Sequence, residues 1–387
     1  MGLRKFRADK FFDGYSFCEN NPVLITDEQG LIIKITDEES AGDDVEYLEG
    51  ILSPGFINCH CHLELSHLKG QIPEGTGLVD FLASVMNQRY FPIEEILDAI
   101  VKTENEMLIK GIVAVGDICN TAHSVLQKKS RKIFYHNFIE VSGVNDDVAE
   151  KRFMQALSVY EEFAKISNLP SASNSMVPHS PYSVSEKLWS QLVSFPGNQL
   201  FSFHNQETPA ENEWFEKKEG IFHELFHKLK INISHFIATG KSSLQTVLPR
   251  FLPNQDILLV HNVATTREDI MFAEQYGNVH WCICINANKY ITGLIPPVEL
   301  FRKHDCNIVL GTDSLASNHS LNILDEIKTI RDSFPLIPLG EILRWATSNG
   351  AKALNISDRY GSFERGKSPG IIAIKETNEV TVVQFDN

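Results

Sequence analysis

The chemistry-bearing residues of this sequence begin with "NCHCHLELS" (58–66), in which two cysteines and two histidines alternate. In a β-strand, residues two apart point to the same face. His60 and His62 would therefore face one side together, and Cys59 and Cys61 the other. Paired imidazoles suit a transition metal. Because buried cysteine commonly behaves as a small hydrophobic residue, we expect the two thiols to pack against helices.

Further histidines and an acid follow other apolar runs of the sequence. His179, His204, His261 and Asp313 all fall at or just after the end of such a run. Together with the first pair, another imidazole and a carboxylate would form a mixed nitrogen and oxygen site suited to Zn²⁺ or Fe²⁺. A coordination position left open for water would indicate catalysis. A lone histidine at a strand end is more often a hydrogen-bonded core residue, so the hypothesis depends on several occurring together.

Two acidic residues stand close to these histidines in the chain. Glu207 lies three residues after His204, where a carboxylate could take a proton from a metal-bound water and pass it to a leaving group. A solvated loop acid is the alternative interpretation. Glu64 follows His62 in a similar way and either binds substrate or braces the loop. His67 is retained as a candidate because it lies in the loop above the predicted site.

Eight short runs rich in valine and isoleucine supply the elements that must position these residues. Helix-length segments separate the runs, a pattern typical of a (β/α)₈ barrel, in which the carboxyl ends of the strands form the active-site mouth. A doubly wound open sheet gives a similar alternation, but no glycine-rich phosphate loop follows an early strand. The predicted strands are 55–62, 111–118, 132–141, 174–182, 200–207, 257–263, 279–288 and 307–314.

The segments between the strands contain recognisable helices. Apolar spacing predicts helices over 77–90 and 321–334. Pro338 is expected to start a further helix that Gly350 ends. The segment 208–256 is longer than one helix needs, so we expect extra helices there, near the mouth of the barrel.

The two ends of the chain carry a different pattern. Residues 23–35 and 371–385 each consist of two apolar runs around a polar turn, which predicts a β-hairpin at each end. We expect the two hairpins to meet in one small β-unit.

A second C-x-C pair, Cys282 and Cys284, lies in the predicted seventh strand. Four-cysteine zinc sites generally use C-x₂-C spacing, and the outward faces of the first and seventh strands are expected to lie apart in a barrel. A structural four-cysteine site is therefore not expected. Seven cysteines, an odd number, argue for reduced thiols rather than a disulfide framework.

Composition excludes several classes of function. The 387 residues are 43% hydrophobic, and 35 basic against 50 acidic residues give a net charge of −15 without a basic stripe. Nucleic-acid binding is therefore not expected. No apolar run approaches the roughly 18 residues of a membrane span, and the N-terminus lacks the apolar stretch of a secretory signal. A cytoplasmic location is the default expectation.

Six segments of the chain together resemble the amidohydrolase superfamily: "PGFINCHCHLELS", "VPHSPYSVS", "FHNQE", "LLVHNV", "CINANKYI" and "LGTDSLASN". They follow the family's order over nearly the whole chain. The closest resemblance is to the mononuclear deaminase branch, which includes cytosine, adenosylhomocysteine, guanine and aminodeoxyfutalosine deaminases. This resemblance implies a (β/α)₈ barrel over 53–354 and a small β-sandwich built from 1–52 and 355–387.

The resemblance also implies roles for individual residues. One divalent transition metal, Zn²⁺ in preference to Fe²⁺, would be held by His60, His62, His204 and Asp313. Glu207 would shuttle the proton, and His261 with Asp313 would hold the nucleophile in line. Substrate contacts are expected from Glu64, Ser66, His179, Asn288 and Ser317.

The sequence departs from the family pattern in three places. Ile285 and Ala287 replace the usual proline and serine of the seventh-strand motif, and "PGI" replaces the usual "ADL" near the C-terminus. These changes concern the substrate pocket rather than the metal ligands. The predicted fourth strand also ends without the lysine that, when carboxylated, bridges two metals in other members, so a single metal is expected.

The implied activity is hydrolytic deamination of an amino-substituted heterocycle. The residues of "HLELS" and "GTDSLASN" most resemble those of aminodeoxyfutalosine deaminase. This resemblance favours a substrate with an adenine-type base on an elaborated ribose. A metal lowers the pKa of its bound water toward about 7, hydroxide attacks the amidine carbon, and ammonia leaves. A small heterocycle is thus the expected partner, with a homodimer as a candidate assembly.

Three rival functions remain open at this point. The same metal site could perform hydrolytic dechlorination or cleave a cyclic amide. A non-catalytic metal-binding barrel would be expected to have lost a ligand or Glu207, and neither is lost. A nicotinamide-dependent oxidoreductase would need a phosphate loop that the sequence lacks.

Overall fold

The centre of the molecule consists of two parallel four-stranded sheets, ordered β6-β7-β8-β9 and β10-β11-β12-β13. The computed structural model describes residues 2–130, 132–167, 172–377 and 379–385. All eight predicted strands are present, so the mixed α/β class with parallel sheets is confirmed. Their bounds are β6 Phe56–Cys61, β7 Ile112–Cys119, β8 Phe134–Val141, β9 Ala172–Pro178, β10 Leu200–Asn205, β11 Asp256–His261, β12 Val279–Ile283 and β13 Asn307–Leu310.

The two sheets are linked by backbone hydrogen bonds at both pairs of edges. His204 N donates to His179 O at 2.9 Å, which joins β10 to the residue after β9. At the other edge, Thr312 N and Asp313 N both donate to His60 O, at 2.9 and 3.1 Å. These links bring the carboxyl ends of strands from both sheets into one region of the molecule.

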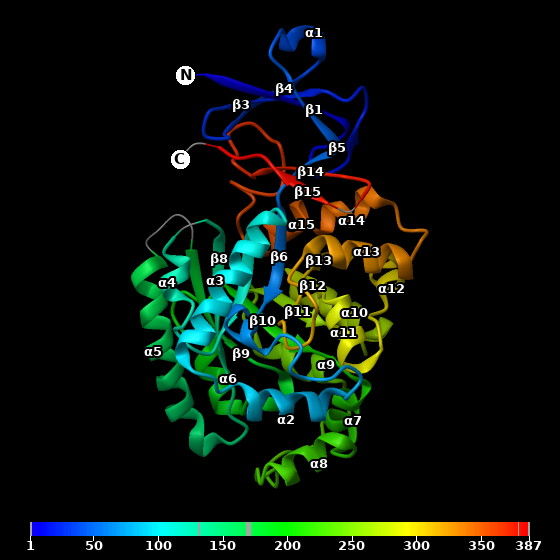
Figure 1. Cartoon of the computed structure of the whole chain (residues 1–387). Helices are drawn as coiled ribbons and strands as arrows, with labels where there is room; N and C mark the ends of the chain where they lie inside the picture. The colour runs from blue at the N-terminus through cyan, green and yellow to red at the C-terminus, as the bar shows by residue number, and fades with distance from the viewer. Residues whose placement is uncertain (1, 131, 168–171, 378, 386–387) are drawn as a thin grey trace.

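Helices surround the two sheets (Figure 1). The predicted helices over 77–90 and 321–334 are confirmed as α2 and α13. The α-helices after the first are α2 Leu78–Gln88, α3 Ile93–Ile109, α4 Val125–Lys128, α5 Ala149–Ser167, α6 Glu186–Val193, α7 Pro209–Lys217, α8 Ile221–Lys228, α9 Ser243–Val247, α10 Arg267–Ala273, α11 Ile285–Thr292, α12 Val298–Lys303, α13 Ile323–Ser333, α14 Leu339–Trp345 and α15 Ser348–Ala353. Short 3₁₀ helices are η1 Leu63–Leu68, η2 Asp146–Val148, η3 Pro181–Ser183, η4 Leu248–Arg250 and η5 Glu274–Tyr276.

Several predicted strands extend beyond the observed ones, and the overrun is largest for the fourth, the seventh and the eighth, whose strand β13 ends at Leu310. The seventh was predicted over 279–288, but β12 ends at Ile283 and α11 begins at Ile285. That helix ends in a left-handed cap at Gly293, with φ of 75°, a common helix terminator. The fourth was predicted over 174–182, but β9 ends at Pro178 and Pro181 opens η3. Proline has no backbone N–H to continue the ladder.

Gly350 does not end a helix, contrary to the sequence prediction. Helix α14 ends at Trp345, and Gly350 lies inside α15. A Cβ atom at this position would lie 3.0 Å from the Cβ atom of Ile57 and 3.2 Å from the Cys59 sulfur. Glycine is therefore present because α15 packs closely on β6, a role that local sequence patterns do not reveal.

The segment 208–256 holds α7, α8, α9 and η4, as predicted. An apolar cluster joins this segment to α2, η1 and η3, with Trp214, Phe222, Phe226 and Tyr182 among its buried members. The rings of Tyr182 and Phe222 lie 4.4 Å apart. This cluster forms a cap next to the carboxyl ends of the strands, and α7 and α8 lie at the end of the molecule away from the chain termini (Figure 1).

The two chain ends share one seven-stranded sheet of order β15-β14-β5-β1-β3-β4, with β2 paired to β1. Both predicted hairpins are confirmed as antiparallel pairs, β3 with β4 and β14 with β15, and β14 joins the N-terminal β5. A two-layered sandwich stays a prediction. The elements are β1 Leu3–Phe12, β2 Phe17–Cys18, β3 Val23–Asp27, β4 Ile32–Thr36, α1 Glu38–Ala41, β5 Glu46–Pro54, β14 Ile371–Ile374 and β15 Val380–Val382.

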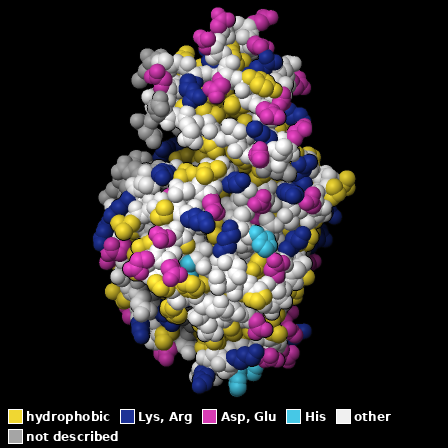
Figure 2. Space-filling view, viewed as in Figure 1, with side chains coloured by type: hydrophobic (Ala, Val, Ile, Leu, Met, Phe, Trp, Pro, Cys, Tyr) yellow, Lys and Arg dark blue, Asp and Glu magenta, His cyan; other side chains and the backbone are white. Residues whose placement is uncertain are grey.

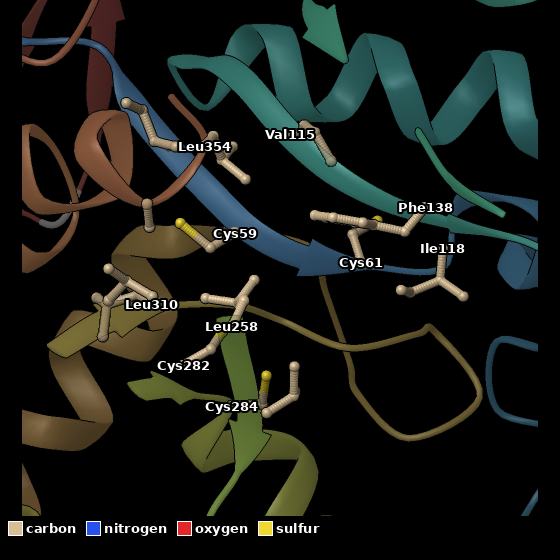
Figure 3. Close-up of a cluster of buried hydrophobic side chains, with 14 of the residues drawn as sticks. Cys59, Cys61, Val115, Ile118, Phe138, Leu258, Cys282, Cys284, Leu310 and Leu354 are labelled. Carbon is tan, nitrogen blue, oxygen red and sulfur yellow. The ribbon is translucent and has the colours of Figure 1, made fainter. Parts of the chain in front are cut away.

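The cysteines of the two C-x-C pairs pack in the hydrophobic core, as expected, and none forms a disulfide (Figure 3). Burial raises the pKa of Cys59 well above its usual value, and neighbouring Cys282 raises it further. A Cβ atom at Gly311 would lie 2.8 Å from Cys282 Sγ, 2.9 Å from Cys284 Sγ and 2.8 Å from His60 Cβ. The side-chain-free Gly311 lets the seventh-strand thiols approach the first strand.

The surface agrees with the charge balance of the sequence. On the face shown in Figure 2, acidic and basic side chains are interspersed rather than gathered into a basic stripe. No helix among the described residues is long and apolar enough to cross a membrane.

Candidate metal and active site

The four predicted metal ligands converge at the carboxyl ends of β6, β10 and β13. His62 Nε2 lies 3.2 Å from His60 Nε2 and 3.3 Å from His204 Nε2. Asp313 Oδ1 lies 3.3 Å from His62 Nε2 and 3.7 Å from His60 Nε2. All four side chains are buried. The predicted facing of His60 and His62 toward one point is therefore confirmed.

The spacing of these four donor atoms fits a metal ion. Two donors bound to one zinc ion at about 2.0–2.1 Å with tetrahedral angles lie about 3.3–3.4 Å apart. Three buried imidazole nitrogens this close to one another cannot all be satisfied by mutual hydrogen bonds. Burial lowers the pKa of His62 to about 3, so its imidazole is neutral and able to donate a lone pair at neutral pH.

Asp313 is held by a second group behind the cluster. Ser317 Oγ donates to Asp313 Oδ2 at 2.6 Å, which leaves Oδ1 facing the histidines. Burial would raise the pKa of Asp313, but the imidazoles of His60, His62 and His261 hold it well below its usual range. The carboxylate is therefore charged and oriented, as a metal ligand must be. Ser317, predicted to contact substrate, contacts this ligand.

His261 lies beside the four donors, as predicted. Nitrogen atoms of His261, His60 and His204 and an oxygen of Asp313 all lie within 4.8 Å of one another. Asn288 Nδ2 contacts His261 Nδ1 at 3.0 Å. His261 Nε2 has no hydrogen-bond partner and lies 3.7 Å from Glu207 Oε1. Asn288, predicted to contact substrate, thus orients the ring of His261 toward Glu207.

Glu207 is buried rather than solvated. Its side chain is 6% exposed, and burial together with Asp313 and Glu211 raises its pKa well above the usual value. Glu211 Oε2 accepts a hydrogen bond from Glu207 N at 3.3 Å, and burial raises the pKa of Glu211 to about 7. A buried carboxyl with a raised pKa beside a metal cluster has the properties of a general acid and base.

The backbone around the cluster adopts unusual conformations. Gln206, His261, Asn262 and Asp313 all have positive φ values, of 48°, 76°, 60° and 57°. Such conformations cost about 1–3 kcal/mol each for residues other than glycine and concentrate at functional sites. The buried Asn262 side chain donates to Leu259 O at 2.8 Å and to Cys282 O at 3.1 Å. These bonds hold the strained turn after β11.

His179 lies at the edge of the cluster and is half-buried. Its ring centroid is 4.6 Å from that of His204. Nδ1 contacts the hydroxyl groups of Ser180 and Ser183, each at 3.0 Å. The ring therefore has a fixed orientation next to a metal ligand. The neighbouring Tyr182 hydroxyl is buried without a hydrogen-bond partner.

Glu64 and Ser66 make contacts within the protein. Glu64 accepts hydrogen bonds from Asn120 N at 3.1 Å, Thr121 N at 2.9 Å and Thr121 Oγ1 at 2.6 Å, and Arg89 Nη2 lies 3.4 Å away. These contacts support the interpretation that Glu64 braces the loop rather than the interpretation that it binds substrate. Ser66 Oγ donates to Leu63 O at 2.7 Å within η1.

His67, retained as a candidate, also makes a contact within the protein. Its Nε2 contacts Arg89 O at 3.1 Å, which joins the end of η1 to the end of α2. It is not among the donors that converge with His60 and Asp313.

Glu140 belongs to this site, although sequence reasoning did not select it. It stands near the end of β8, with Oε1 3.5 Å from His204 Nδ1. Burial would raise its pKa, but His179, His204 and His62 lower it to about 2. The available signal was a carboxylate near the end of the predicted strand 132–141, the same positional criterion that selected the histidines.

A buried cluster of three histidines and an aspartate, which could hold a metal ion, lies at the strand ends of this parallel-sheet fold. The model of the Amidohydrolase family matches residues 51–386. The chain therefore belongs to the amidohydrolase family.

Individual relatives agree with this assignment. The chain is 27% identical over 347 residues to a Helicobacter pylori protein named adenosine deaminase, covering 87% of this chain and 82% of the relative. The fold is similar to that of Helicobacter pylori aminofutalosine deaminase in complex with methylthio-coformycin, with a TM-score of 0.81, 24% identity and coverage of 98% and 93%. A Xanthomonas campestris adenosine deaminase with bound zinc gives a TM-score of 0.73, 19% identity and coverage of 96% and 84%.

Proposed function

We propose that this chain is a metal-dependent hydrolytic deaminase of an adenine-type purine nucleoside. The observation that carries the proposal is the convergence of four metal-donor atoms, 3.2–3.7 Å apart in the measured pairs, beside the buried carboxyl group of Glu207. Membership of the amidohydrolase family and relatives named as adenosine and aminofutalosine deaminases support the C–N bond of a cyclic amidine as the bond that is hydrolysed.

The links between the two sheets support a closed (β/α)₈ barrel as the framework of this site. Hydrogen bonds join β9 to β10 and β13 to β6, so the order of the strands around the barrel would follow the chain. We assign the barrel to 53–354 and a small β-domain to 1–52 and 355–387. In such a barrel, the active site lies at the carboxyl ends of the strands.

The donor set suits one divalent metal. His60, His62, His204 and Asp313 would hold the ion, and three nitrogen donors with one oxygen favour Zn²⁺, with Fe²⁺ as the alternative. A divalent ion bound there supplies a water molecule whose pKa is lowered toward about 7.

Residues of the chain would move the proton. Glu207 takes a proton from the attacking water and gives it to the ring nitrogen next to the amino-bearing carbon. His261, held by Asn288, and Asp313 keep the water in line with that carbon. The C–O bond would form first, as the C=N electron pair moves to the ring nitrogen that Glu207 protonates. The exocyclic C–N bond would then break as the C=O bond forms, the second proton of the water would pass to the leaving amino group, and the products would be ammonia and an oxo-purine.

Polar atoms beside the proposed metal ligands would receive the base. Tyr182 Oη, Glu211 Oε1 and Asn288 Oδ1 are buried without a hydrogen-bond partner. Buried polar atoms without partners are rare and costly, so they indicate a bound polar ligand. We propose that His179 contacts the substrate beside them, because its ring borders His204 and is fixed by two serine hydroxyl groups.

An ammonia-release screen tests this function. The zinc-loaded protein would be given adenosine, 5′-deoxyadenosine, methylthioadenosine, adenine, guanine, cytosine and 6-chloropurine riboside. We expect ammonia and an equal amount of oxo-purine from at least one adenine nucleoside. Chloride release without ammonia release from any substrate would replace deamination with dechlorination. Activity that survives complete metal removal would contradict the mechanism.

A further inference from the structure

Glu140 is a buried carboxylate next to the metal ligands, and its two oxygens face different groups. Its side chain is only 7% exposed. Oε1 lies 3.5 Å from Nδ1 of His204, and Oε2 accepts a hydrogen bond from Asn120 Nδ2 at 2.9 Å. A buried charge is costly unless nearby groups compensate it, so its place at this edge of His204 needs an explanation.

The ring of His204 is held from behind. Its Nε2 faces His62 Nε2 at 3.3 Å, while Nδ1 donates to the backbone oxygen of His179 at 2.8 Å. The N–H is therefore on Nδ1, which leaves the Nε2 lone pair free. Metal-binding histidines generally donate their second N–H to a carbonyl or carboxylate, which fixes the ring and raises its basicity. Here the carbonyl of His179 accepts the bond, and the Glu140 charge lies against the same edge.

The second oxygen of Glu140 extends this support to the loops. Asn120 donates its side-chain N–H to Glu140 and its backbone N–H to Glu64. Glu64 lies on η1, the turn that follows His62. One chain of hydrogen bonds thus runs from the turn after the first-strand ligands, through the loop after β7, to the carboxylate behind the fifth-strand ligand.

We propose that Glu140 is a positioning residue of the metal centre. The His179 carbonyl orients the His204 ring, and the Glu140 charge beside Nδ1 stabilises the N–H at that atom, increases the donor strength of Nε2 and connects this edge of the ring to the Asn120 loop. This inference rests on the proposed metal ligands but not on the identity of the substrate. Zinc binding and ammonia release are measured separately, so either can fail alone.

Zinc titration against a chromophoric chelator tests the proposal on the purified, metal-stripped full chain. Glu140→Gln keeps the size of the side chain and removes its charge. We expect its dissociation constant for zinc to rise about 10- to 100-fold, the usual effect of losing an outer carboxylate. Glu104→Gln is the matched control, because Glu104 is buried and hydrogen-bonded to Tyr135 outside the metal site. Its zinc affinity should match that of the wild type.

Two further variants guard against a folding defect. Glu140→Asp keeps the charge and should recover part of the zinc affinity lost in Glu140→Gln. Asn120→Ala removes only the side-chain link and should weaken zinc binding less than Glu140→Gln does. Unchanged zinc affinity in a folded Glu140→Gln protein would overturn the proposal. So would a rise in KM alone, because that result would make Glu140 a substrate contact.

Discussion

Two polar clusters are buried against the same parallel sheets, and they differ in how their hydrogen bonds are satisfied. One lies between β7, β8 and α4, where Lys128 Nζ contacts Asp117 Oδ2 at 2.5 Å and Asn137 Oδ1 at 2.6 Å. The other is the metal-ligand cluster. In the first, positive charge meets negative charge directly. In the second, three imidazole nitrogens face one another, and His261 Nε2 has no hydrogen-bond partner.

The backbone φ values also distinguish the two clusters. Asp117, Lys128 and Asn137 have ordinary φ values, whereas His261 and Asp313 are held in the left-handed region. Burial would lower the pKa of Lys128, but Asp117 raises it above the usual value, so the Lys128 ammonium group remains charged. The first cluster is complete within the chain and stabilises the fold. The second leaves His60 Nδ1 and His261 Nε2 without a hydrogen-bond partner among the described residues.

This difference gives a physical criterion for separating a structural polar cluster from a functional one. A buried network that satisfies its own charges needs no other molecule. A cluster that combines strain, unpartnered polar atoms and converging lone pairs is stabilised when a ligand binds. The following four changes test that distinction, from the largest expected effect to the smallest.

Removal of the metal should have the largest effect on the functional cluster. Atomic absorption on the purified protein should find about one transition metal per chain. Dialysis against a chelator should reduce ammonia release to background, and one equivalent of Zn²⁺ should restore it. Zinc at 100 times its dissociation constant should also add about 2.7 kcal/mol to the free energy of unfolding. Full activity in metal-free protein would rule out the proposed site.

Lys128→Met should have the largest effect on stability. It leaves Asp117 buried without its cation, which typically costs about 3–5 kcal/mol. Urea unfolding measures the loss, while zinc stoichiometry of the folded fraction should not change. Lys129 is the exposed neighbour of Lys128, so the Lys129→Met protein is the control and should have the same free energy of unfolding as the wild type. Unaltered stability in Lys128→Met would show that the pair contributes nothing to the fold.

Glu207→Gln should separate catalysis from metal binding. The variant keeps the shape of the side chain but cannot accept and return a proton, so kcat should fall by at least about 100-fold. Zinc content should remain at the wild-type value, because Glu207 is not among the ligands. Glu216, exposed on the helix α7 that follows Glu207, provides the control variant Glu216→Gln. Near-normal turnover in Glu207→Gln would remove this residue from the mechanism.

Ser317→Ala should have the smallest effect of the four. It removes the hydrogen bond of 2.6 Å that orients Asp313, so zinc affinity should fall by about 10-fold, the lower end for loss of a group behind a metal ligand. Chelator competition measures the change. Ser320→Ala, which loses a bond to Asp325 away from the site, should retain wild-type affinity. A change in KM with unaltered zinc affinity would instead support the predicted substrate contact.

Much of the fold and the candidate donor residues could be predicted from short-range patterns, and the resemblance to the amidohydrolase superfamily selected four of these residues as expected ligands. The alternation of His60 and His62 has a period of two, so their shared face follows from strand geometry alone. The strand ends at His204, His261 and Asp313 were visible because apolar runs stop there. Such patterns are local. A strand that ended elsewhere would bury polar side chains or expose apolar ones.

Predictions that needed contacts between distant residues were less accurate. The turn of α11 after Ile283 places Asn288 against His261, and the predicted longer strand missed it. Gly350 was assigned to a helix end, whereas α15 needs it to approach β6. Gly311 was not singled out, although its missing side chain leaves room for the thiols of Cys282 and Cys284 beside His60.

The sequence by itself determined the kinds of donor atoms, their spacing along the first strand and the parallel α/β framework, since these depend on residue type and periodicity. Only the tertiary structure decided which polar side chains stand behind the ligands. Glu140, Asn288 and Ser317 contact His204, His261 and Asp313 across different strands and loops. The partner of a buried carboxylate, amide or hydroxyl is set by packing between distant segments, and no local pattern encodes it.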